Sequence, residues 1–274
     1  MRLERLANRA PAAPALHGHS EADVVIIGAG YTGFAAASAW QQARPEDRIK
    51  ILEADRVGEG SPGRNSGFML EIALANDARP EELERMEKLN ALSRQTMALL
   101  RERVERFGID CQLERSGTYR AARSAIGQRA LNQYEAFLKA AGLSYQRLNG
   151  SQLAERIGTR YYTQGIYSPD CYLVQPAALI VGLADSLEAG IELHEHSPAT
   201  QIVPDGKKWR VTTPEGEVTA GQVILANNAF SRALGADPSR LTAIYTYAAI
   251  TEPLPEPERQ RIAATTWGCS PHTA

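Results

Sequence analysis

The stretch Ala22-Asp-Val-Val-Ile-Ile-Gly-Ala-Gly-Tyr-Thr-Gly33 decides the fold of this chain. Its first part, Asp23 to Ile27, is a short apolar run of the kind that forms a buried strand, and Tyr31 to Gln42 has the pattern of a helix. The motif Gly28-x-Gly30-x-x-Gly33 therefore lies where a strand passes into a helix, which is the context that makes it informative. It predicts a dinucleotide-binding turn, and a glycine-rich turn of an unrelated α/β protein is the alternative.

Each glycine of the motif has its own predicted role. Gly28 permits the tight turn, Gly30 lets a pyrophosphate approach the backbone, and Gly33 lets the helix pack closely on the strand. Tyr31 and Thr32 open the helix, whose N-terminus is expected to hold the phosphates. These five residues are the predicted phosphate-binding residues.

An acidic residue follows the next predicted strand. The strand Arg48 to Glu53 ends in a carboxylate twenty residues after Gly33. A carboxylate there accepts hydrogen bonds from ribose hydroxyls and repels a 2′-phosphate, which favours NAD or the ADP half of FAD over NADP. We therefore place Glu53, and Ala54 after it, in the predicted cofactor site.

Length and composition set wide limits. The chain has 274 residues, of which 43% are hydrophobic, so it can form one large or two modest domains. Its formal charge of -2 gives no electrostatic case for binding nucleic acid or an anionic membrane. The three cysteines, Cys111, Cys171 and Cys269, are far apart and form no C-x-x-C pair, so we expect free thiols in a reducing cytoplasm and no cysteine metal site.

The N-terminal residues carry no recognisable export signal. Residues 1–21 are predicted to be an irregular, solvated leader, and a transit peptide is less favoured because Glu4 interrupts the basic residues. No apolar stretch has the length of a membrane span, so we expect a soluble, cytoplasmic protein. His194 and His196 could share a metal, but no third ligand lies near them in sequence, and exposed strand residues are expected instead.

A second glycine-rich segment, Gly60-Ser-Pro-Gly-Arg-Asn-Ser-Gly67, follows Glu53. With the first motif and Glu53, it resembles the D-amino-acid-oxidase-like (DAO) flavoproteins, most closely their γ-glutamylputrescine oxidase branch. The resemblance implies FAD as the cofactor and places Arg64, Asn65 and Ser66 near the flavin; a loop held by its own polar contacts is the alternative. Since no His or Cys lies between Glu53 and Leu70, the resemblance also implies that FAD is bound non-covalently.

The middle of the chain has the pattern of a second, substrate-side region. Apolar residues recur at helical spacing from Pro80 to Phe107, and a further helix is predicted from about Ile126 to Ala141. Between them, Cys111 to Leu113 and Gly117 to Ala121 are predicted strands.

The later part of the chain returns to the nucleotide-binding region. A helix is predicted from Pro176 to about Gly190, a strand over Ile191–His196, a hairpin of Lys208–Thr212 with Glu217–Thr219, and a strand over Gln222–Ala226. This order also resembles the DAO family. The resemblance places Ala199 and Thr200 at the adenine end of FAD and Ala226 and Asn227 near its ribityl or pyrophosphate part, with a plain strand-end cap as the alternative for Asn227.

The predicted fold class is α/β: a Rossmann-like FAD-binding domain, with a parallel sheet and a β-meander, beside a partial α+β substrate domain. The FAD-binding domain is expected at residues 22–76 and 150–232, and the substrate domain at residues 77–149 and 233–274, where Leu241–Thr251 is a predicted strand. The family normally continues for more than a hundred further residues. We therefore expect a truncated, frame-shifted or partial chain, and possibly a partner chain or oligomer that completes the fold.

By resemblance, the function is oxidation of an amine or amino acid. In this chemistry a hydride passes from the carbon next to nitrogen to the flavin, the imine hydrolyses, and dioxygen is reduced to peroxide. No catalytic base is required of the chain, so no catalytic residue is named, and no metal is expected. Its partner is a small-molecule amine rather than nucleic acid or membrane. The alternatives are a non-catalytic FAD-binding remnant or subunit, and an NAD-dependent dehydrogenase.

Overall fold

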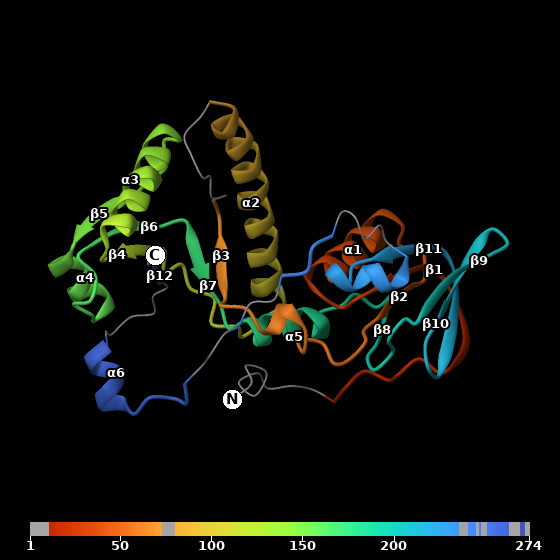
Figure 1. Cartoon of the computed structure of the whole chain (residues 1–274). Coiled ribbons are helices and arrows are strands. Elements are labelled where there is room, and N and C mark those ends of the chain that lie inside the picture. The colour runs from red at the N-terminus through yellow and green to blue at the C-terminus, as the bar shows by residue number, and fades with distance from the viewer. Residues whose placement is uncertain are drawn as a thin grey trace. The chain divides into compact units, whose positions relative to one another are not determined.

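A computed structural model describes residues 11–72, 80–235, 241–244, 247, 251–262 and 269–271. The chain forms two compact units (Figure 1). The first consists of Met1–Ser66, Ile109–Cys111 and Pro176–Ala249, and the second of Gly67–Gly108, Gln112–Gln175 and Ile250–Ala274.

The first unit contains a six-stranded sheet in the order β8-β2-β1-β11-β10-β9. Strands β8, β2, β1 and β11 run parallel, and β11, β10 and β9 form an antiparallel meander, which confirms the predicted α/β fold class. The strands are β1 (Gly18–Ile27), β2 (Ile49–Leu52), β8 (Ile191–His194), β9 (Gln201–Asp205), β10 (Lys208–Thr212) and β11 (Gly216–Leu225). Helices α1 (Tyr31–Ala43) and α5 (Pro176–Asp185), and the 3-10 turns η2 (Ser61–Gly63) and η3 (Asn228–Leu234), complete this unit.

The core of the sheet explains why β1 reads as a continuous apolar run. Val24, Val25 and Ile26 are fully buried, because β1 has a parallel neighbour on each side and the faces of the sheet are covered. Strand β11 pairs with β1 over almost its whole length, so the hairpin strand and the following parallel strand, which we predicted separately, are one strand of ten residues.

Residues 11–21 differ from the solvated leader predicted for residues 1–21. Strand β1 already begins at Gly18, because Gly18 pairs with Gly216 of β11. Upstream, the Ala13 amide donates to the Glu195 carboxylate at 2.7 Å, and the Leu16 amide donates to Ser197 Oγ at 2.9 Å. Residues 11–17 are therefore attached to the residues after β8; residues 1–10 lie outside the described part.

The second unit contains a four-stranded sheet in the order β12-β4-β6-β5 and a two-stranded sheet of β3 and β7. Its strands are β3 (Phe68–Leu70), β4 (Thr118–Ala122), β5 (Gln146–Asn149), β6 (Gln164–Ser168), β7 (Cys171–Leu173) and β12 (Cys269–Pro271). Its helices are α2 (Pro80–Phe107), α3 (Ala125–Ala140), α4 (Gly150–Ile157) and α6 (Glu256–Ile262). Helix α3 packs on one face of the larger sheet through Leu131, Phe137 and Leu138, and α4 packs on the other through Leu153 and Ile157.

Several expected elements differ from the structure. Residues 150–175 were expected in the nucleotide domain, but they lie in the second unit because β6 pairs with β4 and β5. Cys111 to Leu113 form no strand. Of the strand expected over Leu241–Thr251, residues 241–244, 247 and 251 are described and are not strand, and the others lie outside the described residues.

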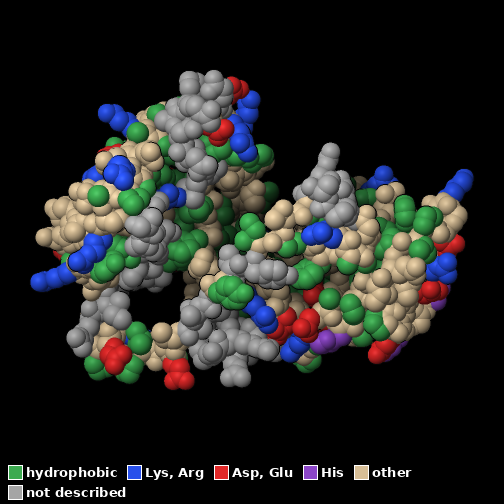
Figure 2. Space-filling model, viewed as in Figure 1, with side chains coloured by type: hydrophobic (Ala, Val, Ile, Leu, Met, Phe, Trp, Pro, Cys, Tyr) green, Lys and Arg blue, Asp and Glu red, His purple; other side chains and the backbone are tan. Residues whose placement is uncertain are grey.

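The described residues bear on the expectations for surface charge, membrane spans and metal sites. On the face shown in Figure 2, basic and acidic side chains are dispersed among apolar and neutral ones. No helix in the described part of the chain is both long and apolar enough to cross a bilayer. Nor do the described residues gather three His, Cys, Asp or Glu side chains in a way that could hold a metal ion.

Candidate functional site

The turn between β1 and α1 requires glycine at two positions for packing alone. Gly28 has a φ of +106°, and a Cβ there would lie 2.9 Å from the Ala226 carbonyl oxygen. A Cβ on Gly33 would lie only 2.0 Å from the Gly28 carbonyl oxygen. The turn is further tied to the sheet because the Gly28 amide donates to the Leu52 carbonyl at 2.8 Å.

Gly30, unlike Gly28 and Gly33, is not required to be glycine by the packing of the turn. Its φ of -93° is open to any residue, and among described atoms a Cβ there would meet only Pro62 Cγ, at 3.4 Å. It is the N-cap of α1, which has no side-chain cap and no acidic residue in its first turn. Space beside the backbone and first-turn amides without a side-chain cap are the features that suit a phosphate at the N-terminus of this 13-residue helix.

The carboxylate of Glu53 lies beside this turn. It accepts hydrogen bonds from the Ala29 amide at 2.9 Å and from the Asp55 amide at 3.2 Å. The backbone of Glu53 bonds to the amide of Ser197 and the carbonyl of His194, both at 2.8 Å, so its place at the end of β2 is fixed by the sheet. Ala54, the next residue, is exposed.

The segment after Glu53 folds back over the start of α1. The Tyr31 hydroxyl donates to the Pro62 carbonyl at 3.4 Å, and the Asn65 amide group donates to the same carbonyl at 2.7 Å. Burial raises the pKa of Tyr31, and a hydrogen bond with Asn65 partly offsets this. Arg64 forms an exposed ion pair with Glu59. The structure therefore brings Asn65 and Tyr31 together at the Pro62 carbonyl, while Thr32 and Ser66 are exposed.

A second G-x-G-x-x-G motif, which the sequence analysis did not identify, occurs at Gly58, Gly60 and Gly63. Gly58 has a φ of +88°, and a Cβ on Gly63 would lie 2.1 Å from the Gly58 carbonyl oxygen. This close approach repeats that of Gly28 and Gly33. The identical spacing of the glycines was the signal that could have found it.

The remaining predicted site residues are Ala226 and Asn227, which follow β11, and Ala199 and Thr200, which precede β9. The Ala226 amide donates to the Ile27 carbonyl at 2.8 Å, and Asn227 follows with a buried Oδ1 that has no hydrogen-bond partner. Ala199 packs against the core cluster that contains Ile27 and Leu52. The amide and the hydroxyl of Thr200 both donate to the Thr212 carbonyl, at 2.8 and 3.1 Å, so these donors are used within the sheet.

These residues fit a dinucleotide. The open backbone at Gly30, the uncapped helix N-terminus, the carboxylate at the end of β2 and the unpartnered Asn227 Oδ1 beside Gly28 all lie at the carboxyl ends of parallel strands. In doubly wound sheets, ligands bind at that end. Glu53 and the α1 turn can hold the ADP part. The segment Gly60–Gly67, which carries the resemblance to flavoproteins, follows Glu53 in the chain.

Comparisons with known proteins show what this chain is similar to. A sequence model of the DAO family, described as FAD dependent oxidoreductase, matches residues 23–272. The chain is 28% identical over 214 residues to gamma-glutamylputrescine oxidoreductase of Escherichia coli, covering 76% of this chain and 49% of that protein. It is 26% identical over 226 residues to the probable oxidoreductase OrdL of Haemophilus influenzae, covering 79% of this chain and 51% of that protein.

Solved structures share the fold. Glycine oxidase from Geobacillus kaustophilus superposes with a TM-score of 0.67 at 25% identity, covering 79% of this chain and 58% of that chain. L-amino acid deaminase from Proteus myxofaciens, in complex with anthranilate, superposes with a TM-score of 0.63 at 24% identity, covering 83% and 50%. The chain thus spans about half the length of the curated relatives that it matches.

Proposed function

This chain belongs to the DAO family of FAD-dependent oxidoreductases, and from that premise we propose that its first unit binds FAD non-covalently. The observation that carries the proposal is the turn at Gly30, where the backbone is open at an uncapped helix N-terminus beside the fixed carboxylate of Glu53. Non-covalent binding is supported by the segment between Glu53 and Leu70, which contains neither His nor Cys.

We further propose that the protein oxidises a small-molecule amine or amino acid. When bound, FAD supplies a hydride acceptor for the carbon next to nitrogen, and dioxygen then takes the electrons to give peroxide. The residues of this chain would bind and orient the cofactor: the α1 turn would hold the pyrophosphate, Glu53 would accept hydrogen bonds from the ribose, and Arg64, Asn65 and Ser66 would contact the flavin. A γ-glutamylputrescine-like amine is the proposed substrate, supported by the 28% identity with gamma-glutamylputrescine oxidoreductase.

A non-catalytic FAD-binding subunit is the second candidate function. The observation that favours it is that the chain covers only 49–52% of three curated relatives. In this case a partner chain, or a second copy, completes the substrate side. The family membership disfavours the third alternative, an NAD-dependent dehydrogenase, because the matched family uses FAD.

The test of FAD binding is the visible spectrum of the purified chain after incubation with FAD and gel filtration. We expect the flavin absorbance to stay with the protein and to pass into solution on denaturation, since the binding is non-covalent. Absorbance retained by the denatured chain would contradict non-covalent binding. A chain that keeps NAD but no flavin would overturn the proposal.

The test of activity is peroxide release from the FAD-loaded chain with γ-glutamyl amines, polyamines and amino acids. Turnover within the ordinary enzyme range of about 1 to 1,000 per second supports the oxidase. FAD binding without turnover, followed by turnover when the remaining segment of a full-length relative is added, supports the subunit. No turnover in either arrangement, with FAD bound, would refute the amine oxidase assignment.

A further inference from the structure

Two arginines of the second unit lie on the same face of its four-stranded sheet. Arg120 of β4 and Arg147 of β5 are both directly opposite Ile166 of β6, and directly paired residues share a face. This face is covered by α3, whose Tyr134 and Phe137 pack in the same cluster as Ile166 (Figure 1). The two arginines therefore occupy equivalent positions on the strands that flank β6.

Arg147 has a full set of acceptors. It forms an ion pair with Glu135 of α3, and it donates to Asn132 Oδ1 of the same helix at 2.9 Å and to Gln164 Oε1 of β6. A partly buried guanidinium needs such partners, because burial without them leaves an unsatisfied charge. Arg147 shows how this sheet face accommodates a cation.

Arg120 has none of these acceptors. Its guanidinium lies 3.9 Å from the centre of the Tyr134 ring, and in the described structure it has no carboxylate or other hydrogen-bond acceptor. Burial lowers the pKa of Arg120. The side chain is partly exposed, so a small molecule can reach it. The ring face attracts the guanidinium cation but leaves its N–H donors without an acceptor in the described structure.

Two buried hydroxyl groups on the side of the sheet that α3 covers also have no partner. Ser168 is 1% exposed and Tyr134 is 5% exposed, and neither Ser168 Oγ nor the Tyr134 hydroxyl has a hydrogen-bond partner. Ser168 is opposite Thr118 in the β4–β6 pairing, so it lies on the same face as Arg120 and diagonally across from it. Arg120 and Ser168 thus lie on one sheet face, and Tyr134 belongs to α3, which covers that face.

We propose that Arg120, Tyr134 and Ser168 form a binding site for the carboxylate of a small organic acid. A carboxylate suits the site because a guanidinium offers two parallel N–H donors to its two oxygens and matches its single charge. Ser168 and Tyr134 can donate to the oxygen lone pairs that the guanidinium leaves free. The site lies wholly within the second unit and does not depend on FAD, so it stands apart from the proposed oxidase function.

The test is isothermal titration calorimetry of the full chain with sodium acetate and sodium glutamate as probes, against sodium chloride at equal ionic strength. The key variant is Arg120→Met, which keeps most of the apolar stem. We expect saturable binding by the parent and a ten- to hundredfold weaker affinity in the variant, as a lost charge-assisted hydrogen bond implies. Ser168→Ala should weaken binding by about fivefold.

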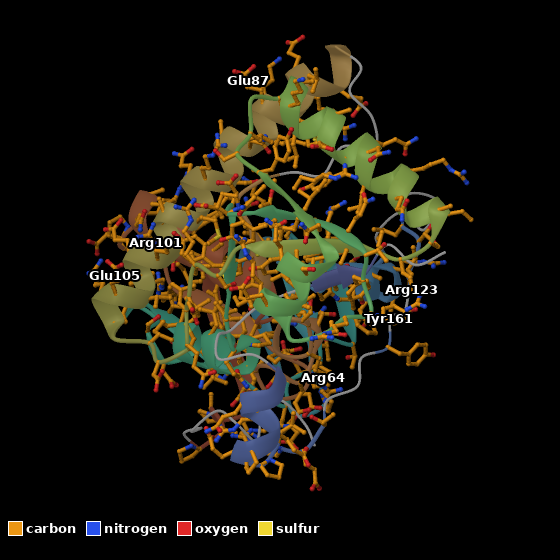
Figure 3. The ribbon with its side chains drawn as sticks, turned by 90° about the vertical axis from the view of Figure 1, so that its left-hand side faces the viewer. Arg64, Glu87, Arg101, Glu105, Arg123 and Tyr161 are labelled. Carbon is orange, nitrogen blue, oxygen red and sulfur yellow. The ribbon has the colours of Figure 1, made fainter. Side chains whose placement is uncertain are left out.

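Arg123→Met is the matched control. Arg123 is exposed, lies beside Tyr161 with its guanidinium 5.0 Å from that ring, and is three residues from Arg120 (Figure 3). Its loss removes the same charge from the same unit, so affinity for both probes should stay within twofold of the parent. Equal weakening by the control would show that only general charge attraction is measured and would overturn the site.

The free energy of unfolding gives a second measurement. Without added carboxylate, Arg120→Met should be at least as stable to urea as the parent, because it removes a partly buried charge without a counter-ion. Absence of saturable binding by the parent overturns the proposal, as does unchanged binding by a folded Arg120→Met variant. Should that variant not fold, unchanged binding by the Ser168→Ala and Tyr134→Phe variants together would also overturn it.

Discussion

The two glycine turns of the first unit, Gly28–Gly33 and Gly58–Gly63, have the same spacing but different surroundings. Both begin with a glycine at positive φ, and in both the last glycine lies against the carbonyl of the first. The first turn joins the buried strand β1 to the 13-residue helix α1. The second has no strand directly before it and leads into η2, a 3-10 turn of three residues.

This difference shows that the glycine spacing is sufficient for a tight turn but not for a phosphate-binding site. The spacing specifies a tight turn in both places, because the same carbonyl must fit against the last glycine. A phosphate site also needs several parallel amides at the start of a longer helix, and only the first turn has these. We therefore expect the first turn to bind the pyrophosphate and the second to shape the loop over it.

The largest expected effect is that of Gly33→Ala. The new Cβ would lie 2.0 Å from the Gly28 carbonyl oxygen, and both groups are backbone held between β1 and α1. We expect a loss of about 3 kcal/mol or more in the free energy of unfolding, at the upper end for overpacking. Urea denaturation followed by circular dichroism measures it. A stable, FAD-binding variant would show that α1 can move away from β1.

The second-largest expected effect is that of Gly30→Val, which changes the affinity for FAD rather than the free energy of unfolding. Gly30→Val should reduce FAD affinity at least ~100-fold, because the side chain takes the space that the pyrophosphate needs. The fold should stay intact, since the Gly30 backbone suits valine and, among described atoms, its Cβ would meet only Pro62 Cγ. Flavin retention and urea denaturation are measured together.

The matched control is Gly60→Val at the equivalent position of the second turn. A Cβ on Gly60 would meet only Pro62 Cδ, at 3.6 Å, so the change is equally tolerable for packing. We expect a much smaller loss of FAD affinity than for Gly30→Val. Equal losses would erase the distinction between the two turns and make both of them phosphate sites.

A smaller effect is expected for a change at Glu53, which tests binding of the ribose rather than of the phosphates. Glu53→Ala should weaken FAD binding by about 1 to 3 kcal/mol, the range for a lost hydrogen bond to a charged group. The same change removes the acceptor of the Ala29 and Asp55 amides, so its stability must be measured as well. An unchanged dissociation constant for FAD would show that Glu53 serves only to hold the turn.

The smallest effect concerns the last glycine of the second turn. Gly63→Ala places a Cβ 2.1 Å from the Gly58 carbonyl oxygen, but the segment can shift because η2 is short and partly exposed. We expect a loss of about 1 to 2 kcal/mol in unfolding free energy, below that of Gly33→Ala. The two variants are compared in one urea series. A loss as large as that of Gly33→Ala would show that the second turn is as rigid as the first.

Local pattern predicted the long elements well. The helix expected at Tyr31–Gln42 is observed at Tyr31–Ala43, and that from Pro80 to Phe107 has the same bounds. The strand expected at Cys111–Leu113 is absent, and α6 and β12 were not predicted. These short segments have too few residues for periodicity to distinguish a strand from a loop, so their conformation depends on what lies beside them.

The sequence by itself determined the strand–turn–helix at Gly28–Gly33, the acid at Glu53 and the family to which the chain belongs. These follow from residues that are close together in the chain and from backbone conformations that only certain residues adopt. Tertiary structure alone decided that residues 11–17 attach beside Ser197, that β11 extends along β1, and that Arg120 lacks the acceptors that Arg147 has. The physical reason is that these outcomes depend on pairing and burial between residues far apart in the chain, which no local periodicity records.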